Sequence, residues 1–358
     1  MHHLACFISA HGFGHAARAC AVLQALRQFQ PSIQLTIYTQ APAWFFEQTL
    51  GPTFVYVPCD TDVGVVQSTP LDENLPATLN RLQAFYPFSS THLQTLANDL
   101  RGRHADAVLC DISPLGIATA HTAGLPALLV ENFTWDWIYA GYVTRAPGLQ
   151  TFLEPLRQIF ASSDLHIQTE PICEIWPSAH VHTTPAARRA RLSRAEVRSR
   201  LRVPERAPMV LLSMGGIPEH FTFLKALKQL PHLHFVVPGG SQTPCFEDNL
   251  TLIPHRSQFY HPDLVAACDL LVGKSGYSTI AEACQSNVPF AFISRSNFRE
   301  APILTAFIQQ HLPSLEIREA DYPSLTWLTK LEELLGQPRP TQQLPNGAAS
   351  IAKALLQF

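Results

Sequence analysis

The sequence lacks the features of a membrane-spanning, disulfide-stabilised or nucleic-acid-binding chain. No apolar run reaches the roughly 18 residues that cross a bilayer, and Leu4–Ala10 is too short and uncharged for a secretory signal. The eight cysteines form no C-x-x-C pair, so neither a metal site nor a disulfide framework is expected. A net charge of -3 gives no general attraction to nucleic acid. We expect a cytoplasmic protein whose thiols are reduced and mostly buried.

Three familiar motifs are incomplete, and each gap excludes a class of protein. A Walker loop ending at Gly273 needs a second glycine where the chain has Cys268. A nucleophile elbow around Ser275 needs glycine where the chain has Tyr277. A nicotinamide enzyme needs an acidic residue near the end of its second strand, which here reads Tyr-Thr-Gln up to Gln40.

Short apolar runs alternate with helix-like stretches along all 358 residues, a pattern typical of α/β layers. Each half opens with a strand that ends in a Gly-rich turn. We predict two doubly wound, Rossmann-like sheets facing a central cleft, with ligands beyond the carboxyl ends of the strands. The predicted strands are Leu4–Ser9, Gln34–Thr39, Thr53–Val57, Ala107–Cys110, Ala127–Val130, Leu165–Gln168, Met209–Ser213, His234–Val237, Leu250–Ile253, Leu270–Val272 and Phe290–Ile293.

Residues 186–206 separate the two halves. Eight arginines fall between Arg188 and Arg206, interrupted by Glu196 and Glu205, which indicates a solvated linker helix. Contact of this run with acidic lipid or with a phosphate-bearing acceptor is the alternative. The predicted organisation is an N-terminal domain over 1–185, a linker over 186–206, a C-terminal domain over 207–342, and a final helix in 343–358 that packs back on the first domain.

A further turn, within Asp269–Cys284, has the composition of a phosphate-binding loop, and we call it the second Gly-rich turn. Amides at a helix start have no intrahelical partner and carry the positive end of the dipole, and Gly276 lets the main chain come close to a ligand. Glu282, one turn further, suits two ribose hydroxyls. The alternative is that Thr279 and Glu282 form a capping box. Hydroxyl donors at this turn are Ser275, Ser278 and Thr279.

The first Gly-rich turn carries a histidine that suits proton transfer. Strand Leu4–Ser9 runs into Gly12, Gly14 and His15, so His15 is expected at a helix start facing the cleft. A neutral imidazole accepts a proton, which makes His15 a candidate general base. The alternative is a histidine that only caps or packs the turn, and for His11 the two interpretations are evenly matched.

Further polar side chains follow predicted strands at the same edge. Asp111 is either a cleft residue or a helix N-cap. Asp60-Thr61-Asp62 matches a D-x-D metal pair but is more typical of a turn. The loop Glu131–Trp137 combines two tryptophans with carboxylates and an amide, which suits a sugar. The loop Ser294–Glu300 is expected beside the second Gly-rich turn, where it could read a donor sugar; its alternative is a plain exposed loop.

Together these segments resemble the GT-B fold glycosyltransferases. More specifically, they are similar to the glycosyltransferase-like N-terminal domain of plant L-arabinokinases and, more distantly, to the lipid II-forming N-acetylglucosaminyltransferase. The motifs are HGFGHAAR at His11–Arg18, DVGVVQ at Asp62–Gln67, ENFTWDWIYAGYV at Glu131–Val143, YHPDLVAACDLLVGKSGYSTIAEA at Tyr260–Ala283 and FREAP at Phe298–Pro302. Phe13 narrows the first turn relative to the lipid II enzyme, so its lipid acceptor is not expected here. No sugar-kinase domain follows, so kinase activity is not implied.

The resemblance implies a nucleotide-sugar donor on the C-terminal domain and an acceptor on the N-terminal domain. His15 matches the family's base. The implied donor residues are Gly14, Gly215, Gly216, Phe259, Ser275, Gly276, Tyr277, Ser278, Thr279, Glu282, Arg299 and Glu300. The expected acceptor residues are His11, Asp111, Glu131, Asn132, Trp135 and Asp136.

The leading hypothesis is a hexosyltransferase-type enzyme that moves a sugar from a nucleotide sugar, in the UDP class, to a hydroxyl acceptor. Inversion is the leading expectation, and retention stays open because nothing in the sequence fixes which face of the sugar is attacked. Transfer without a metal or other cofactor is expected, because helix dipole and hydroxyls at Ser275–Thr279 can stabilise the departing diphosphate. Two alternatives stay open. One is a nucleotide-sugar hydrolase in which His15 activates water, and the other is a non-catalytic nucleotide-sugar-binding protein.

Overall fold

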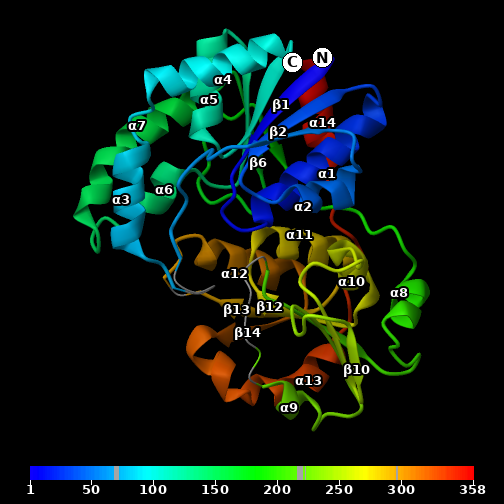
Figure 1. The fold of residues 1–358 in the computed structure, drawn as a ribbon. Helices are drawn as coiled ribbons and strands as arrows, with labels where there is room; N and C mark the ends of the chain where they lie inside the picture. Colours follow the sequence, from blue (N-terminus) through cyan, green and yellow to red (C-terminus); the bar gives the residue numbers. More distant parts are fainter. Residues whose placement is uncertain (68–71, 216–220, 222, 296) are drawn as a thin grey trace. The chain divides into compact units, whose positions relative to one another are not determined.

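A computed structural model describes residues 1–67, 72–215, 221, 223–295 and 297–358. These residues form two compact units. Unit 1 contains residues 1–67, 72–187 and 346–358, and unit 2 contains the described part of Arg188–Pro345. In Figure 1, unit 1 carries the blue-to-green elements and the red C-terminal helix, and unit 2 carries the remaining green-to-orange elements.

Unit 1 is built on a seven-stranded sheet in the order β3-β2-β1-β4-β5-β6-β7. All its pairs are parallel, and the central strands are buried over their whole length, as expected for a sheet covered on both faces. The strands are β1 His3–Ile8, β2 Gln34–Thr39, β3 Val55–Pro58, β4 Ala107–Asp111, β5 Ala127–Glu131, β6 Leu165–Thr169 and β7 Val181–Thr183.

The helices of unit 1 begin and end at recognisable signals. In α5, the Ser113 side chain accepts from the Gly116 amide, and Gly124 ends the helix in a left-handed conformation. The C-terminal helix α14 packs on α1 and adds Ile351 and Leu355 to the core. The helices are α1 Gly14–Phe29, α2 Ala43–Leu50, α3 Leu75–Phe85, α4 Ser90–Gly102, α5 Pro114–Ala123, α6 Trp135–Ala140, η1 Pro147–Leu149, α7 Gln150–Ala161 and α14 Gly347–Gln357.

Unit 2 repeats this architecture with the order β10-β11-β9-β8-β12-β13-β14. Only β10 is antiparallel to its neighbour among the described pairs. Gly273 lets β12 approach β8, because a Cβ there would lie 2.0 Å from the Ser213 carbonyl oxygen. The strands are β8 Met209–Ser213, β9 His234–Pro238, β10 Cys245–Glu247, β11 Leu250–Ile253, β12 Leu270–Lys274, β13 Phe290–Ser294 and β14 Ser314–Arg318. The helices are α8 Arg194–Arg200, α9 Leu224–Leu227, α10 His261–Ala267, α11 Tyr277–Ser286, α12 Ala301–His311, η2 Glu319–Ser324, η3 Thr326–Lys330 and α13 Leu331–Leu335.

The predicted fold class is confirmed, and each predicted strand is present with shifts of no more than two residues. The strands that the sequence did not predict are β7, β10 and β14, and each lies at the edge of its sheet. Edge strands are partly exposed, so they have no continuous apolar run to reveal them. The structure also places the arginine-rich segment from Arg188 onward in unit 2, where α8 packs on α10. No helix in the described ranges is long and apolar enough to cross a membrane.

Candidate active site

His15 lies in the first turn of α1, directly after the turn that follows β1. Its Nδ1 atom is 2.9 Å from Oδ1 of Asp111, the last residue of the neighbouring strand β4. Both side chains are buried. The two adjacent strands therefore end at the same edge of the sheet and bring a histidine and a carboxylate together.

Arg18, one turn further along α1, fixes the charge of this pair. Its Nε donates to Asp111 Oδ2 at 2.8 Å and its Nη2 to Oδ1 at 2.6 Å. Burial by itself raises the pKa of the Asp111 carboxyl, but Arg18 and His15 outweigh it and leave the pKa below its usual value. An ionised carboxylate only accepts, so in the neutral imidazole of His15 the proton lies on Nδ1 and the lone pair on Nε2.

The Nε2 atom of His15 has no hydrogen-bond partner within the described ranges. Aromatic rings border the imidazole, with the Phe133 centroid at 5.8 Å and the Trp135 centroid at 6.3 Å. A buried carboxylate behind Nδ1 and an open Nε2 are the arrangement of an oriented general base. The geometry places Asp111, expected as an acceptor residue, behind the histidine instead.

Asp62 is a second carboxyl near His15. It accepts a hydrogen bond from Trp135 Nε1 at 2.9 Å, and burial raises its pKa to about 6. Asp60, its partner in the D-x-D string, is exposed. Across the described residues no group of three or more His, Cys, Asp or Glu is arranged to hold a metal ion.

The loop after β5 is more deeply buried than a sugar-binding loop should be. Glu131 has no exposed surface, and its Oε1 accepts from His166 at 2.8 Å and Gln168 at 2.7 Å. Trp135 is 1% exposed and stacks on Tyr139. A fully buried side chain cannot meet an acceptor without rearrangement, so Glu131 is placed as a structural anchor of this loop.

The other expected acceptor residues either contact the cluster around His15 or stabilise the loop after β5. Asn132 accepts from Arg18 Nη1 at 2.6 Å, which ties the loop to the His15 cluster. Asp136 forms an ion pair with Arg157 at 3.2 Å. The His11 ring contacts Trp135 edge-on, with centroids 5.4 Å apart, and is only partly buried. Of this set, His11 is the most accessible, and all the acceptor roles stay predictions.

In unit 2, helix α11 begins at Tyr277 with Gly276 as its N-cap and no side-chain cap. The capping-box alternative for Thr279 and Glu282 is therefore wrong, because Thr279 already lies inside the helix. The positive end of α11 is left without a side-chain acceptor, which favours an anionic ligand there. The Ser275 hydroxyl donates to the Ile293 carbonyl at 3.1 Å, so it stabilises the turn.

Glu282 is held between two basic side chains. Arg188 Nε donates to Oε1 at 2.9 Å, and His261 Nδ1 lies 2.7 Å from Oε2. Burial raises the pKa of Glu282, but Arg188 and His261 bring it below the usual value. His261 Nε2 continues the chain to Ser213 Oγ at 2.8 Å. Each carboxylate oxygen keeps a lone pair, so the expected ribose contact stays a prediction.

Lys274, at the end of β12, is a cation that the sequence analysis did not select. Burial and then Arg295 lower its pKa from 10.5 to about 7, and it makes no hydrogen bond within the described ranges. Its Cε lies 4.0 Å from a Cβ built on Gly215, in the turn after β8. A lysine at this place suits a phosphate group. The sequence signal for this lysine is Gly273-Lys274-Ser275, which matches the end of a Walker loop without its earlier glycine.

The loop after β13 is ordered around an ion pair. Arg295 Nη2 donates to Glu300 Oε1 at 3.1 Å, and its guanidinium stacks over Phe298 at 3.8 Å. Glu300 is thus engaged by its own loop, while Arg299 is partly buried. Phe259 packs partly buried against the core of unit 2. Two positions from the expected site and its loop, Gly216 and Ser296, lie outside the described residues.

The fold of the chain has relatives among solved structures. Solved structures that match nearly the whole chain are glycosyltransferases, and the chain has their GT-B fold. They include a UDP-glucosyltransferase from Polygonum tinctorium (TM-score 0.63, 11% identity, 99% of this chain and 98% of that chain). Another is MurG of Acinetobacter baumannii (TM-score 0.55, 14% identity, 100% of both chains).

At the level of sequence, the chain resembles L-arabinokinase of Arabidopsis thaliana. The two are 29% identical over 356 residues, which cover 98% of this chain and 34% of that protein. The chain thus spans about a third of the length of this relative. No protein-family model matches the chain.

Proposed function

We propose that the chain is a glycosyltransferase that moves a sugar from a nucleotide sugar to a hydroxyl acceptor, with His15 as the base. The observation that carries this proposal is the buried His15–Asp111 contact of 2.9 Å beside an open Nε2. A nucleotide-binding protein without catalysis has no need of an oriented imidazole whose second nitrogen is open. The GT-B fold supports the reaction class.

In this mechanism the acceptor hydroxyl gives its proton to His15 Nε2 while its oxygen forms a bond to the anomeric carbon. The bond from that carbon to the diphosphate oxygen breaks, and the nucleoside diphosphate leaves with the electron pair. The imidazolium that forms is stabilised by the adjacent Asp111 carboxylate. Attack opposite the leaving group inverts the anomeric configuration.

Unit 2 supplies the groups that suit the donor. The uncapped start of α11 and the ammonium of Lys274 both favour a diphosphate. They offer positive charge where a divalent cation acts in other enzymes, so we propose transfer without a metal. The UDP class is proposed from the likeness to a UDP-glucosyltransferase.

The test is a screen of UDP-sugars with hydroxyl acceptors, followed by mass spectrometry of both products in the presence and absence of EDTA. Glycosylated acceptor together with UDP supports the proposal. Sugar release at the same rate without acceptor would assign the chain as a hydrolase. Tight UDP-sugar binding with no turnover in wild type would make it a binding protein, and no binding of any UDP compound would overturn the donor class.

A further inference from the structure

The arginine-rich segment borders a hollow at one edge of the unit 2 sheet. The turn between β12 and α11, which we call the donor turn, lies at the opposite edge. Asp269 immediately precedes β12 and contacts the first residue of β8, whereas the donor turn follows the other end of β12. The hollow has a volume of about 260 Å³ and is separate from every residue assigned above. Its lining includes Arg194, Arg198, Arg206, Arg339, Glu205 and Asp269.

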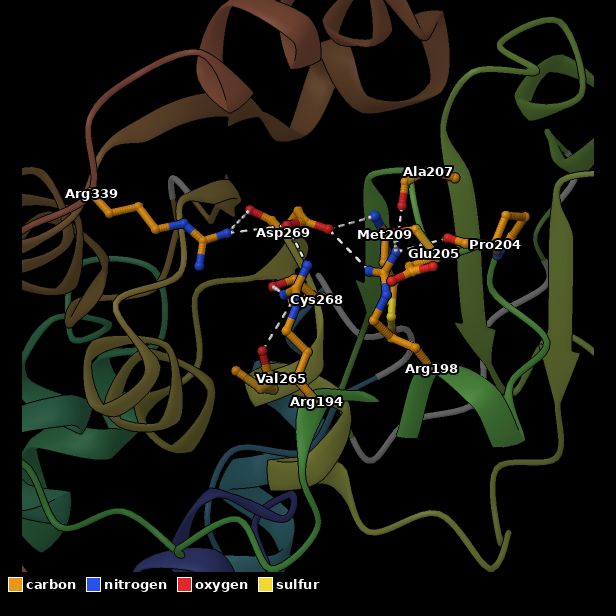
Figure 2. A network of polar contacts seen from close by, with 10 residues as sticks. All are labelled: Arg194, Arg198, Pro204, Glu205, Ala207, Met209, Val265, Cys268, Asp269 and Arg339. Carbon is orange, nitrogen blue, oxygen red and sulfur yellow. Dashed lines mark hydrogen bonds and ion pairs between the residues drawn. The ribbon is translucent and has the colours of Figure 1, made fainter. Parts of the chain in front are cut away.

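Asp269 organises the arginines around this hollow, as Figure 2 shows. Its Oδ1 accepts from Arg194 Nη2 at 2.6 Å and from Arg339 Nη2 at 3.5 Å. Its Oδ2 accepts from Arg198 Nη1 at 3.1 Å and from the Met209 amide at 2.8 Å. One carboxylate thus holds guanidinium groups from α8 and from the segment after α13.

Arg198 is committed to the fold. Its side chain is 8% exposed, and its Nη2 also donates to the backbone carbonyls of Pro204 and Ala207. Arg194 and Arg339 differ, because their side chains are 42% and 40% exposed. Arg339 uses only Nη2, so its Nε and Nη1 donors have no protein acceptor in the described ranges. The accessible guanidinium edges border the hollow.

The charges do not balance. Four arginines line the hollow with two carboxylates, Asp269 and Glu205, which leaves an excess of two positive charges. Arg206 is exposed and makes no hydrogen bond or ion pair within the described ranges. Holding like charges together is unfavourable unless an anion joins them. A phosphate monoester carries nearly two negative charges at neutral pH, and guanidinium groups match its oxygens.

We propose that this hollow, which we call the Asp269 pocket, binds a phosphate monoester. Arg194, Arg206 and Arg339 donate to the phosphate oxygens, while Arg198 and Asp269 hold the pocket in shape. The phosphate belongs either to a small soluble molecule or to a phosphatidate headgroup. The proposal does not depend on the glycosyltransferase assignment, because no residue is shared with either candidate cluster.

The test measures inorganic phosphate binding by equilibrium dialysis at constant ionic strength, with chloride as the balancing anion. We expect Arg206→Gln, and more strongly Arg194→Gln with Arg339→Gln, to weaken phosphate binding by at least about tenfold. Arg200→Gln is the matched control. Arg200 lies on helix α8 with Arg194, but it pairs with Glu196 and does not line the hollow. Arg206→Gln breaks no hydrogen bond or ion pair of the described residues, so its result does not depend on the stability of the double variant.

Phosphate can also occupy the donor turn, so the comparison is repeated in a Lys274→Gln background. Unchanged phosphate affinity in Arg206→Gln and in the double variant would overturn the Asp269 pocket. Co-sedimentation with phosphatidate vesicles, against phosphatidylcholine vesicles, identifies the source. Vesicle binding lost in the double variant but kept in Arg200→Gln supports a lipid headgroup, and phosphate binding without vesicle binding supports a soluble ligand. Absence of both kinds of binding in wild type overturns the proposal.

Discussion

Each unit contains a carboxylate held by an arginine and a histidine, but the second ring nitrogen of the histidine has different surroundings in the two units. In unit 1, Asp111 accepts from an arginine Nε and faces the Nδ1 atom of His15. In unit 2, Glu282 accepts from an arginine Nε and faces the Nδ1 atom of His261. His15 Nε2 has no hydrogen-bond partner in the described ranges, whereas His261 Nε2 lies 2.8 Å from Ser213 Oγ.

From this difference we propose that His15 is the reactive histidine and His261 a structural one. A carboxylate behind Nδ1 fixes the tautomer of either ring, so the partner of Nε2 decides what the imidazole can do. The open nitrogen of His15 can take a proton from a substrate. The occupied nitrogen of His261 links the end of β8 to helix α11 and orients Glu282.

The largest expected effect comes from removing the two imidazoles in turn. His15→Ala should lower kcat by about 10²- to 10⁴-fold, the range of general base catalysis, while UDP-sugar binding is retained. His261→Ala should instead raise the donor KM and lower kcat by less than about tenfold, because it only loosens Glu282 and Ser213. Steady-state kinetics and donor titration on both variants check the comparison, and equal losses of kcat would erase the distinction.

Asp111→Asn should have the next largest effect. The amide cannot neutralise Arg18 or stabilise an imidazolium, so kcat should fall by about 10²-fold with little change in donor KM. Leaving the buried charge of Arg18 without a carboxylate partner should also lower the free energy of unfolding by about 3 kcal/mol. The matched change Glu282→Gln should raise the donor KM and spare kcat. An Asp111→Asn enzyme with normal kcat would show that His15 needs no orienting carboxylate.

The low pKa of Lys274 leads us to predict that donor binding by unit 2 depends on pH. Its pKa of about 7 means that the ammonium is lost as the pH rises through neutrality. A diphosphate binds the charged form, so donor affinity should be constant below about pH 7. Above it, affinity should fall by up to about tenfold per pH unit. Isothermal titration with UDP across this range tests the sign, and Lys274→Gln should remove the dependence. A pH-independent affinity in wild type would contradict this role.

Strand positions and the two turns followed from the sequence because buried parallel strands read as continuous apolar runs. The edge strand β14 could not be predicted, because several of its side chains are exposed and it has no continuous apolar run. Site residues divided in the same way. His15 and Glu282 lie in helices that directly follow the Gly-rich turns, so a local pattern marks them. The roles of Arg18 and His261 become visible only when the fold brings distant segments together.

The burial of the tryptophan-rich loop could not be predicted from its composition. Its composition suggested an exposed sugar-binding surface, but composition does not report burial, and Trp135 is 1% exposed. The preference of Trp135 Nε1 for an internal acceptor, Asp62, was not visible in the sequence because 73 residues separate the two. Aromatic and carboxylate side chains in one loop therefore indicate either a binding surface or a second small core.

The smallest catalytic effect is expected for Glu131→Gln, which tests the loop directly. Glu131 accepts two buried hydrogen bonds on Oε1, and an amide there leaves both donors, His166 and Gln168, without an ionic acceptor. The free energy of unfolding should fall by about 1–3 kcal/mol, while acceptor KM and kcat change by less than about twofold. His11→Ala is the counterpart, since it should raise acceptor KM with little loss of stability. Urea unfolding together with acceptor kinetics separates them. A large rise in acceptor KM for Glu131→Gln would return this loop to the acceptor site.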